Sequence, residues 1–213
     1  MEERIITKIE KYNNNKYKIF LNDEFAFLIY KSECLRFGLK EGERISDQVY
    51  DEIVSEILPK RARLYAMNLL RKQDRTERNL RRKLAEALYS EDLTEQALNY
   101  VKEFGYLDDT RYSFNYIRLC LGKHGIAEIK HKLSEKGVSP EDIEEGFRQA
   151  REEGFLEDDS EEELIEKLIR KKYHNISELE EADKNKLFAF MYRKGFTVQN
   201  VEKVLKRILT ETA

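Results

Sequence analysis

The sequence has few cysteines and no long apolar run, which argues against a disulfide-rich protein and against a membrane-spanning one. Its two cysteines, Cys34 and Cys120, are too few and too far apart for a disulfide framework, and this agrees with a reducing compartment. No segment approaches the roughly 18 consecutive apolar residues of a membrane span. Residues 1–11 alternate charge with isoleucine and lack the apolar block of a signal peptide. We therefore expect a soluble, cytoplasmic protein with no membrane partner.

Charged residues are abundant and unevenly placed along the chain. They make up 38 % of the residues against 40 % apolar ones, a balance typical of helices with one apolar stripe and a broad solvated face. The formal net charge is −3, yet residues 60–83 contain ten bases and two acids, and residues 135–166 contain fourteen acids and three bases. This uneven distribution argues against a surface that is positive throughout and binds polyanions.

Residues 1–30 alternate apolar and polar side chains with a period of two, which predicts three short antiparallel strands. Asparagine-rich breaks at residues 13–15 and at Asn22-Asp23 supply the turns. Helical patterns at residues 32–37, ended by Gly38, and at residues 47–58 could cover the apolar face of this sheet. Pro59 marks the end of the second helical pattern and of the head. We predict a β-rich head of three strands plus helix over residues 1–58.

After Pro59 the apolar period becomes helical and the sequence repeats itself. One helix start has an apolar residue, then Ser or Thr, and a second apolar residue five positions after the first, which is the spacing of an N-cap with a hydrophobic staple. It occurs at Leu93-Thr94, Val138-Ser139 and Phe196-Thr197.

The helix before each of these starts repeats as well. Glycine closes it at Gly137 and Gly195, whereas the first copy lacks this glycine and carries about four extra residues near 89–92. Acceptable N-caps for it stand at Thr76, Gly125 and Asp183. We predict a mainly α protein of three tandem three-helix repeats, at residues 60–106, 107–153 and 158–210, in an elongated curved array.

The stretch between the first two repeats resembles the signature of the RecX family, glycine–tyrosine–leucine–aspartate–aspartate–x–arginine–tyrosine. Neighbouring segments at 66–70, 78–84 and 125–138 are similar to the family's first and second units, and the resemblance covers residues 60–210 with a weaker match for the head. The signature residues are Gly105, Tyr106, Leu107, Asp108, Asp109, Arg111 and Tyr112.

This resemblance implies a negative regulator without a catalytic centre. RecX proteins bind RecA recombinase, lie along the groove of the RecA–DNA filament and restrain its extension, ATP turnover, strand exchange and co-protease action, in DNA repair, recombination and the SOS response. Glu128 departs from the family pattern, because relatives often carry a base there. This departure weakens the expectation of basic contacts from that helix turn.

A row of bases in the first repeat is the best candidate for partner binding. At steps of three and four its members share one helix-and-turn face, while Leu80 and Leu84 point inward. The row could contact DNA phosphates or acidic patches on RecA, or it could be only a solvated face. A weak, non-specific DNA contact is also expected from it. The candidate residues are Arg71, Lys72, Arg75, Arg78, Arg82 and Lys83.

Other chemistry-bearing residues have simpler interpretations. Asp108 and Asp109 could form a catalytic or metal-binding pair, but we expect one to cap the helix that follows and the other to favour its positive N-terminus. We expect Tyr106 and Tyr112 to pack between units rather than to stack on bases. Cys120 and His124 stand four apart but lack the further ligands of a metal site.

The acidic stretch at residues 157–163 has the form of a capping box from Ser160 to Glu163, although it could also mimic or repel DNA. With no nucleophile and base at motif spacing, no P-loop and no dinucleotide turn, we predict no catalytic residue, cofactor or metal. The protein is expected to be a monomer. The alternative to a RecA regulator is a helix-turn-helix-like DNA-binding regulatory protein, since three-helix units resemble such modules.

Overall fold

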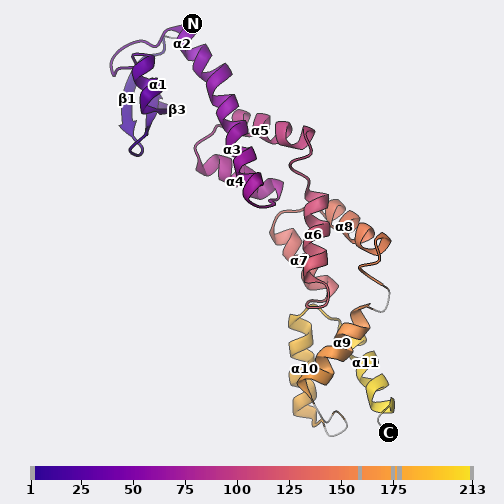
Figure 1. Ribbon diagram of the computed structural model, residues 1–213. Helices are drawn as coiled ribbons and strands as arrows, with labels where there is room; N and C mark the ends of the chain where they lie inside the picture. Colours follow the sequence, from indigo (N-terminus) through magenta and orange to yellow (C-terminus); the bar gives the residue numbers. More distant parts are fainter. Residues whose placement is uncertain (1–2, 158–159, 174–175, 177–178, 212–213) are drawn as a thin grey trace. The chain divides into compact units, whose positions relative to one another are not determined.

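The computed structural model describes residues 3–157, 160–173, 176 and 179–211. By its internal contacts the chain divides into two compact units, Met1–Leu107 and Asp108–Ala213. The first unit holds a small sheet and the helices up to α5, and the second holds α6 to α11 (Figure 1). The predicted mainly helical fold with a three-stranded N-terminal sheet is confirmed.

The sheet is antiparallel in the order β1-β2-β3, with strands β1 Ile6–Lys11, β2 Lys16–Leu21 and β3 Glu24–Tyr30. Asn22 and Asp23 form its tight second turn with φ of 49° and 69°, a left-handed conformation that Asn and Asp tolerate better than most residues. Helix α1, Lys31–Arg36, follows the sheet and Gly38 ends it at φ 61°, as predicted. Ile6, Ile19 and Ile29 carry the apolar face of the sheet into the core of the unit.

The prediction that the helix ends at Pro59 is wrong. Helix α2, Asp47–Asp51, continues through a π-helical turn, η1, at Glu52–Ile57, and then directly into α3, Leu58–Lys72. Proline within a helix cannot donate the backbone hydrogen bond, and its ring crowds the preceding turn. The wider π turn lies where that crowding would fall, which explains why the helix can run past Pro59.

The first three-helix group consists of α3, α4 at Glu77–Glu86 and α5 at Glu91–Glu103. Leu80, Leu84 and Leu98 are fully buried in a core that is continuous with that of the sheet. The predicted N-cap Thr76 is confirmed, because its hydroxyl accepts from the Asn79 amide at 3.2 Å.

Thr94 is not the N-cap of α5, as the repeat pattern predicted. Ser90 is, since its hydroxyl accepts from the Leu93 amide at 3.3 Å, and Thr94 is buried inside the helix. With Ser90 as the cap, α5 and α8 both have 13 residues, so the expectation of about four extra residues in the first copy is wrong. Leu88 has φ 65° in the left-handed position that glycine occupies in the other two copies.

The second unit holds two further three-helix groups, each with its own core. One consists of α6 Asp109–Cys120, α7 Ile126–Glu135 and α8 Pro140–Glu152. The other consists of α9 Ser160–Lys172, α10 Glu181–Arg193 and α11 Val198–Glu211. In every group the first and third helices pack against each other most extensively. A shared packing pattern supports a common origin for the three groups.

Most of the predicted caps of these helices are confirmed, and one is wrong. Ser139 and Thr197 cap α8 and α11 by accepting from the amides of Asp142 and Asn200, at 3.0 and 3.2 Å. Gly125 is the N-cap of α7. Asp183 lies within the first turn of α10, whose N-cap is Glu180. There the Asp183 carboxylate favours the positive end of the helix without capping it.

Helices α6 and α8 approach closely because Gly146 faces Ser113. A Cβ built on Gly146 would lie 2.8 Å from the Ser113 Cβ, so no larger residue fits. Ser113 is fully buried, and its Oγ makes no hydrogen bond with any described residue.

Replacing Ser113 by alanine should therefore stabilise the protein. A buried hydroxyl without a partner carries the cost of lost hydration, on the order of 1 kcal/mol. We expect a free energy of unfolding higher by about that amount in urea denaturation. Thr94 is also a buried hydroxyl residue, in α5 of the other unit, so the effect of removing its hydroxyl can be compared with that at Ser113. A Ser113→Ala variant less stable than the parent would contradict this prediction.

Candidate functional site

The predicted bases lie on the end of α3, on the following turn and along α4 as far as its last turn. We call these six residues the basic surface: Arg71, Lys72, Arg75, Arg78, Arg82 and Lys83. Arg71, Lys72 and Arg78 are exposed, and none of them forms an ion pair with a described residue. Arg78 projects from the first turn of α4, where the positive end of the helix dipole adds to its charge. These three cations are the part of the basic surface best able to meet a negatively charged partner.

The other three members of the basic surface are engaged within the unit. Arg75 donates from Nη1 to Asn79 Oδ1 at 2.7 Å, a neutral partner that leaves its charge in place. Arg82 and Lys83 share the carboxylate of Glu86, at 2.7 and 2.8 Å. Hydrogen bonding from Lys83 holds the pKa of Glu86 below its ordinary value, so Glu86 is ionised and offsets one of the two charges.

The positive charge of this region is smaller than the sequence suggests, because Arg81 is taken up by carboxylates. It pairs with Glu77 at 3.0 Å, with Glu91 at 2.6 Å and with Glu95. Hydrogen bonds from Glu95 and Glu77 raise the pKa of Arg81 above its ordinary value. Arg81 therefore ties α4 to α5 and is unavailable to a partner, which its place in the run of bases did not reveal.

The signature residues form a turn and a helix start. Gly105, at φ 68°, ends α5, and the amides of Tyr106 and Leu107 both bond to the Val101 carbonyl. Leu107 is buried in the core of the first unit. Asp108 caps α6 by accepting from the Arg111 amide at 2.8 Å, and Asp109 occupies the first turn, as predicted.

The two signature tyrosines have different surroundings. Tyr106 is 51 % exposed and its ring stacks against that of Phe104, with centroids 6.4 Å apart. Tyr112 is half-buried and stacks on Tyr116 one helical turn away. Arg111 is exposed on α6. The signature thus serves mainly to shape the chain, and its exposed members are Gly105, Tyr106, Asp108 and Arg111.

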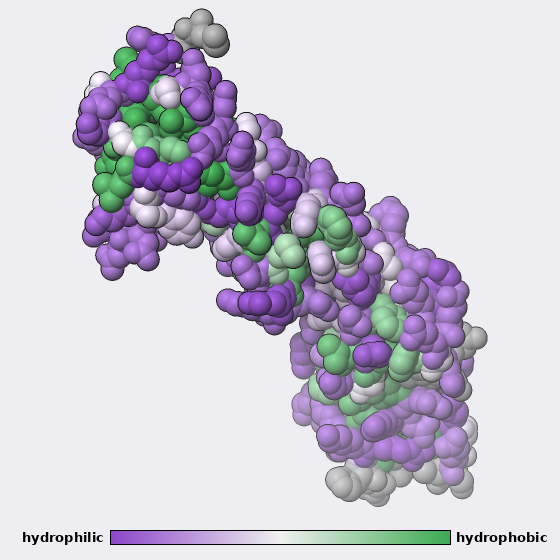
Figure 2. All heavy atoms as spheres, turned by 45° about the horizontal axis from the view of Figure 1, so that its top comes forward, coloured by the Kyte–Doolittle hydropathy of each residue, from purple (hydrophilic) through white to green (hydrophobic). Residues whose placement is uncertain are grey.

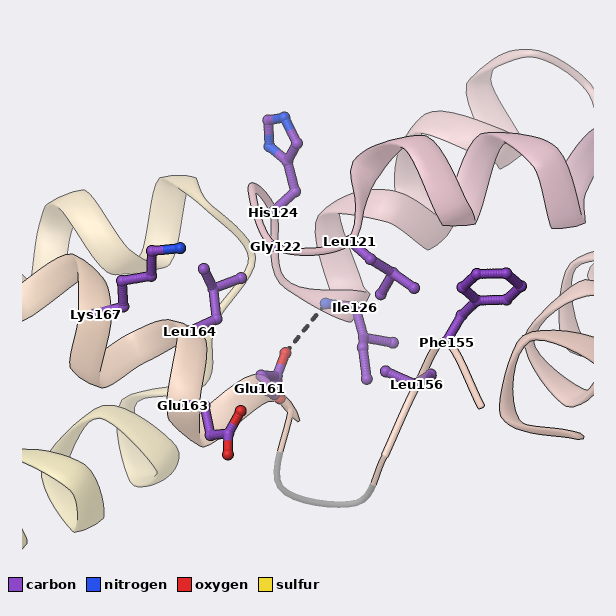
Figure 3. A pocket seen from close by; sticks show the side chains of 10 residues that line it. All are labelled: Leu121, Gly122, His124, Ile126, Phe155, Leu156, Glu161, Glu163, Leu164 and Lys167. Atoms are coloured by element: carbon purple, nitrogen blue, oxygen red, sulfur yellow. Dashed lines mark hydrogen bonds between the residues drawn. The ribbon is translucent and has the colours of Figure 1, made fainter. Parts of the chain in front are cut away.

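The two helical groups of the second unit are joined tightly at α7. The Gly125 amide donates to the Lys194 carbonyl at 2.7 Å, and Glu161 accepts from the Ile126 amide at 3.1 Å and from Asn200 at 3.0 Å. Figure 3 shows Glu161 reaching across a hollow of about 270 Å³ to the start of α7. The carboxylate supplies an acceptor at a helix N-terminus whose N-cap, glycine, has none.

Glu128, the departure from the family pattern, lies at this same joint. It pairs with Lys132 at 2.8 Å and with His124 Nδ1 at 2.6 Å, so it is a structural acid rather than a free one. Burial alone would raise the pKa of Glu128, but the hydrogen bonds from Lys132 and His124 lower it below its ordinary value. The structure thus places a paired carboxylate, rather than a base, at this position of the helix.

Within the acidic stretch at residues 157–163, Glu162 is neutralised by bases of its own helical group. Glu162 pairs with Lys203 and Arg207 of α11, and Glu166 pairs with Arg207 and Arg170. Hydrogen bonding from Lys203 lowers the pKa of Glu162. These pairs give Glu162 and Glu166 a structural role in joining α9 to α11. The predicted cap residue Ser160 has a side chain that lies outside the described residues.

Cys120 and His124 are not brought together with further ligands. In the described part of the chain, no cluster of three or more Cys, His, Asp or Glu side chains is placed to hold a metal ion. Among these residues, too, no helix combines the length and the apolar character needed to cross a bilayer. Hydrophilic side chains cover most of the face shown in Figure 2, and hydrophobic ones gather in a few patches.

These features define a protein built from successive three-helix groups, with a sheet at its N-terminus and its accessible chemistry on charged surfaces. Family models match two of the groups: "RecX, first three-helix domain" at residues 62–100 and "RecX, third three-helix domain" at residues 159–205.

Similar proteins match over nearly the whole chain. Regulatory protein RecX of Clostridium tetani is 30 % identical over 210 residues, which cover 96 % of this chain and 94 % of that protein. The one of Clostridium acetobutylicum is 28 % identical and covers 99 % of both. A crystal structure of regulatory protein RecX superimposes with a TM-score of 0.63 at 26 % identity, covering 94 % of this chain and 98 % of the other. The chain belongs to the RecX family, a family of regulatory proteins.

Proposed function

We propose that this protein is a cytoplasmic, monomeric negative regulator of RecA that binds the RecA–DNA filament. Bound there, it restrains filament extension, ATP turnover, strand exchange and co-protease activity. The observation that carries the proposal is the match, over almost the full length of both chains, to relatives named as regulatory proteins of the RecX family. The protein acts by occupying a surface, with no catalytic residue, cofactor or metal of its own.

The basic surface gives this proposal a physical mechanism. Arg71, Lys72 and Arg78 attract either DNA phosphates in the filament groove or acidic patches on RecA. They form no ion pair with another described residue, so they can bind an anion without first breaking one. The signature residue Tyr106, which is 51 % exposed, provides a second contact. Several modest contacts on successive subunits of a filament give firm binding without a deep pocket.

Reversing the three free cations, as Arg71→Glu, Lys72→Glu and Arg78→Glu together, should abolish most of the inhibition of RecA. We expect at least tenfold weaker binding to RecA–DNA filaments, with unchanged helical content by circular dichroism. If the cations contact phosphates, the log–log salt dependence of binding should become shallower by about 0.9 per lost contact. Strand exchange and ATP turnover in the presence of RecA are the activity measurements.

Arg75 and Arg82 are left unchanged in this variant because they bond Asn79 and Glu86. The matched control reverses Lys171, Arg193 and Lys206, three exposed bases of the last helical group, and changes the net charge equally. Inhibition that survives the first variant, or that is lost equally in the control, would exclude the basic surface as the contact.

The alternative function is that of a helix-turn-helix-like DNA-binding regulator. It is favoured by α4, on which Arg78 and Arg82 are exposed one turn apart, a spacing that suits a groove-facing helix. Against it, Arg81 on the same helix is held by three carboxylates. Filter binding to naked duplex at physiological salt distinguishes the two: tight, sequence-specific binding without RecA would support the alternative.

A further inference from the structure

A cavity in the first unit lies between the sheet with α1 and the first half of α3. Its volume is about 450 Å³, which is within the range of small-ligand sites in proteins. Tyr30 of β3, Tyr65 of α3 and Tyr89 after α4 contribute three aromatic rings to its wall. Lys16 and Lys60 lie at the same cavity. Neither the basic surface nor the family signature includes any of these residues.

The charge in this cavity is positive and partly uncompensated. One carboxylate, that of Glu33, lines it, and the guanidinium of Arg61 engages both oxygens of that carboxylate at 2.5 and 2.6 Å. Lys16 and Lys60 pair with no acid among the described residues; the Lys16 ammonium instead lies 5.0 Å from the Tyr30 ring centroid. Two ammonium groups are thus available to an anionic ligand at a site whose own acid is already neutralised.

The aromatic wall is suited to stacking. The Tyr65 and Tyr89 rings lie 5.9 Å apart at 42° to each other, and both are half-buried rather than sealed. Tyr89 follows Leu88, the leucine at φ 65°. A bulky residue in this conformation costs about 1–2 kcal/mol, and such strain concentrates at binding sites. The other two copies have an unstrained glycine there, so the strain belongs to the one copy that has this cavity.

The cavity connects to the basic surface along one face of α3. Lys60, Leu64, Asn68 and Arg71 are spaced at four, four and three residues, so they share a face, and all four are exposed. The first three line the cavity, and the fourth belongs to the basic surface. With a rise of 1.5 Å per residue, Lys60 and Arg71 lie about 16 Å apart along the helix. Cations at both ends of an exposed stripe suit a chain of phosphates.

From these observations we infer that the cavity binds a nucleotide, with its base against Tyr65 and Tyr89 and its phosphate at Lys60 and Lys16. Stacking on aromatic rings is tolerant of sequence, and positively charged grooves follow the backbone of single strands. The nucleotide comes either from a single strand that continues along α3 to Arg71 or from a free nucleotide. This inference extends the proposed function to the head, yet it can be tested without RecA.

The test measures binding of a fluorescein-labelled oligothymidylate to the full chain by anisotropy. Reversing the cavity lysines, Lys16→Glu with Lys60→Glu, should weaken binding tenfold or more. Reversing Lys11 and Lys31, two exposed lysines of the head that do not line the cavity, gives the same charge change and should have a small effect. These four side chains are exposed or half-exposed, so the variants should fold, which circular dichroism checks.

Photo-crosslinking locates the base. Strands containing 5-iododeoxyuridine should crosslink to Tyr65 or Tyr89, as mapped by mass spectrometry, and the crosslink should disappear in the Lys16/Lys60 variant. Thymidine monophosphate as competitor separates the two sources: displacement by it indicates a free nucleotide, and displacement only by strands indicates single-stranded nucleic acid. Either outcome supports the inference.

Three outcomes would overturn it. Crosslinks confined to residues outside the cavity would exclude the base site, and equal weakening by both lysine pairs would reduce the effect to net charge. Displacement by polyglutamate as efficient as by oligothymidylate would indicate an acidic protein segment as the ligand. None of these outcomes bears on inhibition of RecA, which is measured separately through the basic surface.

Discussion

Replacing Gly195 by alanine should open the joint between the two helical groups of the second unit and cost about 3 kcal/mol of stability. Gly195 has φ 82°, and a Cβ built on it would meet the Glu128 amide nitrogen and, at 2.6 Å, the Glu128 Cβ. These are atoms of a helix start, which cannot move aside as the end of a flexible side chain can. The neighbouring hydrogen bond from Gly125 to Lys194 should be lost with the close approach.

Gly154→Ala is the matched control for the cost of placing alanine in the left-handed backbone conformation. Gly154 has φ 74°, but nothing lies within 4 Å of a Cβ built there. Its substitution should therefore cost only the left-handed strain of about 1 kcal/mol. Urea denaturation followed by circular dichroism gives both free energies, and hydrogen exchange at the Gly125 amide reports the joint directly. Equal destabilisation by the two alanines, with the Gly125 amide still protected, would contradict the importance of this contact.

The joint also matters for the proposed function, because contacts on successive RecA subunits require the helical groups to keep a fixed relation. We expect Gly195→Ala to reduce inhibition of strand exchange and Gly154→Ala to leave it nearly unchanged.

The second large effect is expected at Arg61, where methionine should cost about 2 kcal/mol or more. Arg61 lies on α3 and bonds the Glu33 carboxylate of α1, and it also donates to the Leu28 carbonyl at 3.3 Å and lies over the Tyr30 ring. Its side chain is 14 % exposed and that of Glu33 is 20 % exposed. Removing the cation leaves a carboxylate poorly hydrated and without its ionic partner, which is the costly way to break a buried pair.

A double-mutant cycle with Glu33→Gln isolates this pair. If the penalty comes from the orphaned carboxylate, the double variant should be more stable than the sum of the single effects predicts, by about 1 kcal/mol or more. Arg63→Met provides the comparison on the same helix, since Arg63 bonds the Pro59 carbonyl, lies over the Tyr100 ring and pairs with no carboxylate of the described residues. Strict additivity of Arg61→Met and Glu33→Gln would show that the ion pair does not couple the sheet region to α3.

The sequence determined those features that depend on residues near one another in the chain. The alternation of residues 1–30 and the Asn22-Asp23 turn predicted the sheet, and N-caps at Asp108, Ser139 and Thr197 fixed three helix starts. Each of these signals acts within about four residues, because a cap or a tight turn satisfies backbone groups of its own segment. The family signature could be recognised for the same reason, as it consists of one turn and one cap.

Tertiary structure decided the rest. Nothing local indicates that a π turn lets the helix run past Pro59. The neutralisation of Arg81 by Glu91 and Glu95, the approach of Gly195 to Glu128 and the tyrosine cavity all join residues distant in sequence. Which charge remains free, and which glycine cannot be replaced, depends on packing, because burial and pairing are set by the neighbours that folding brings together.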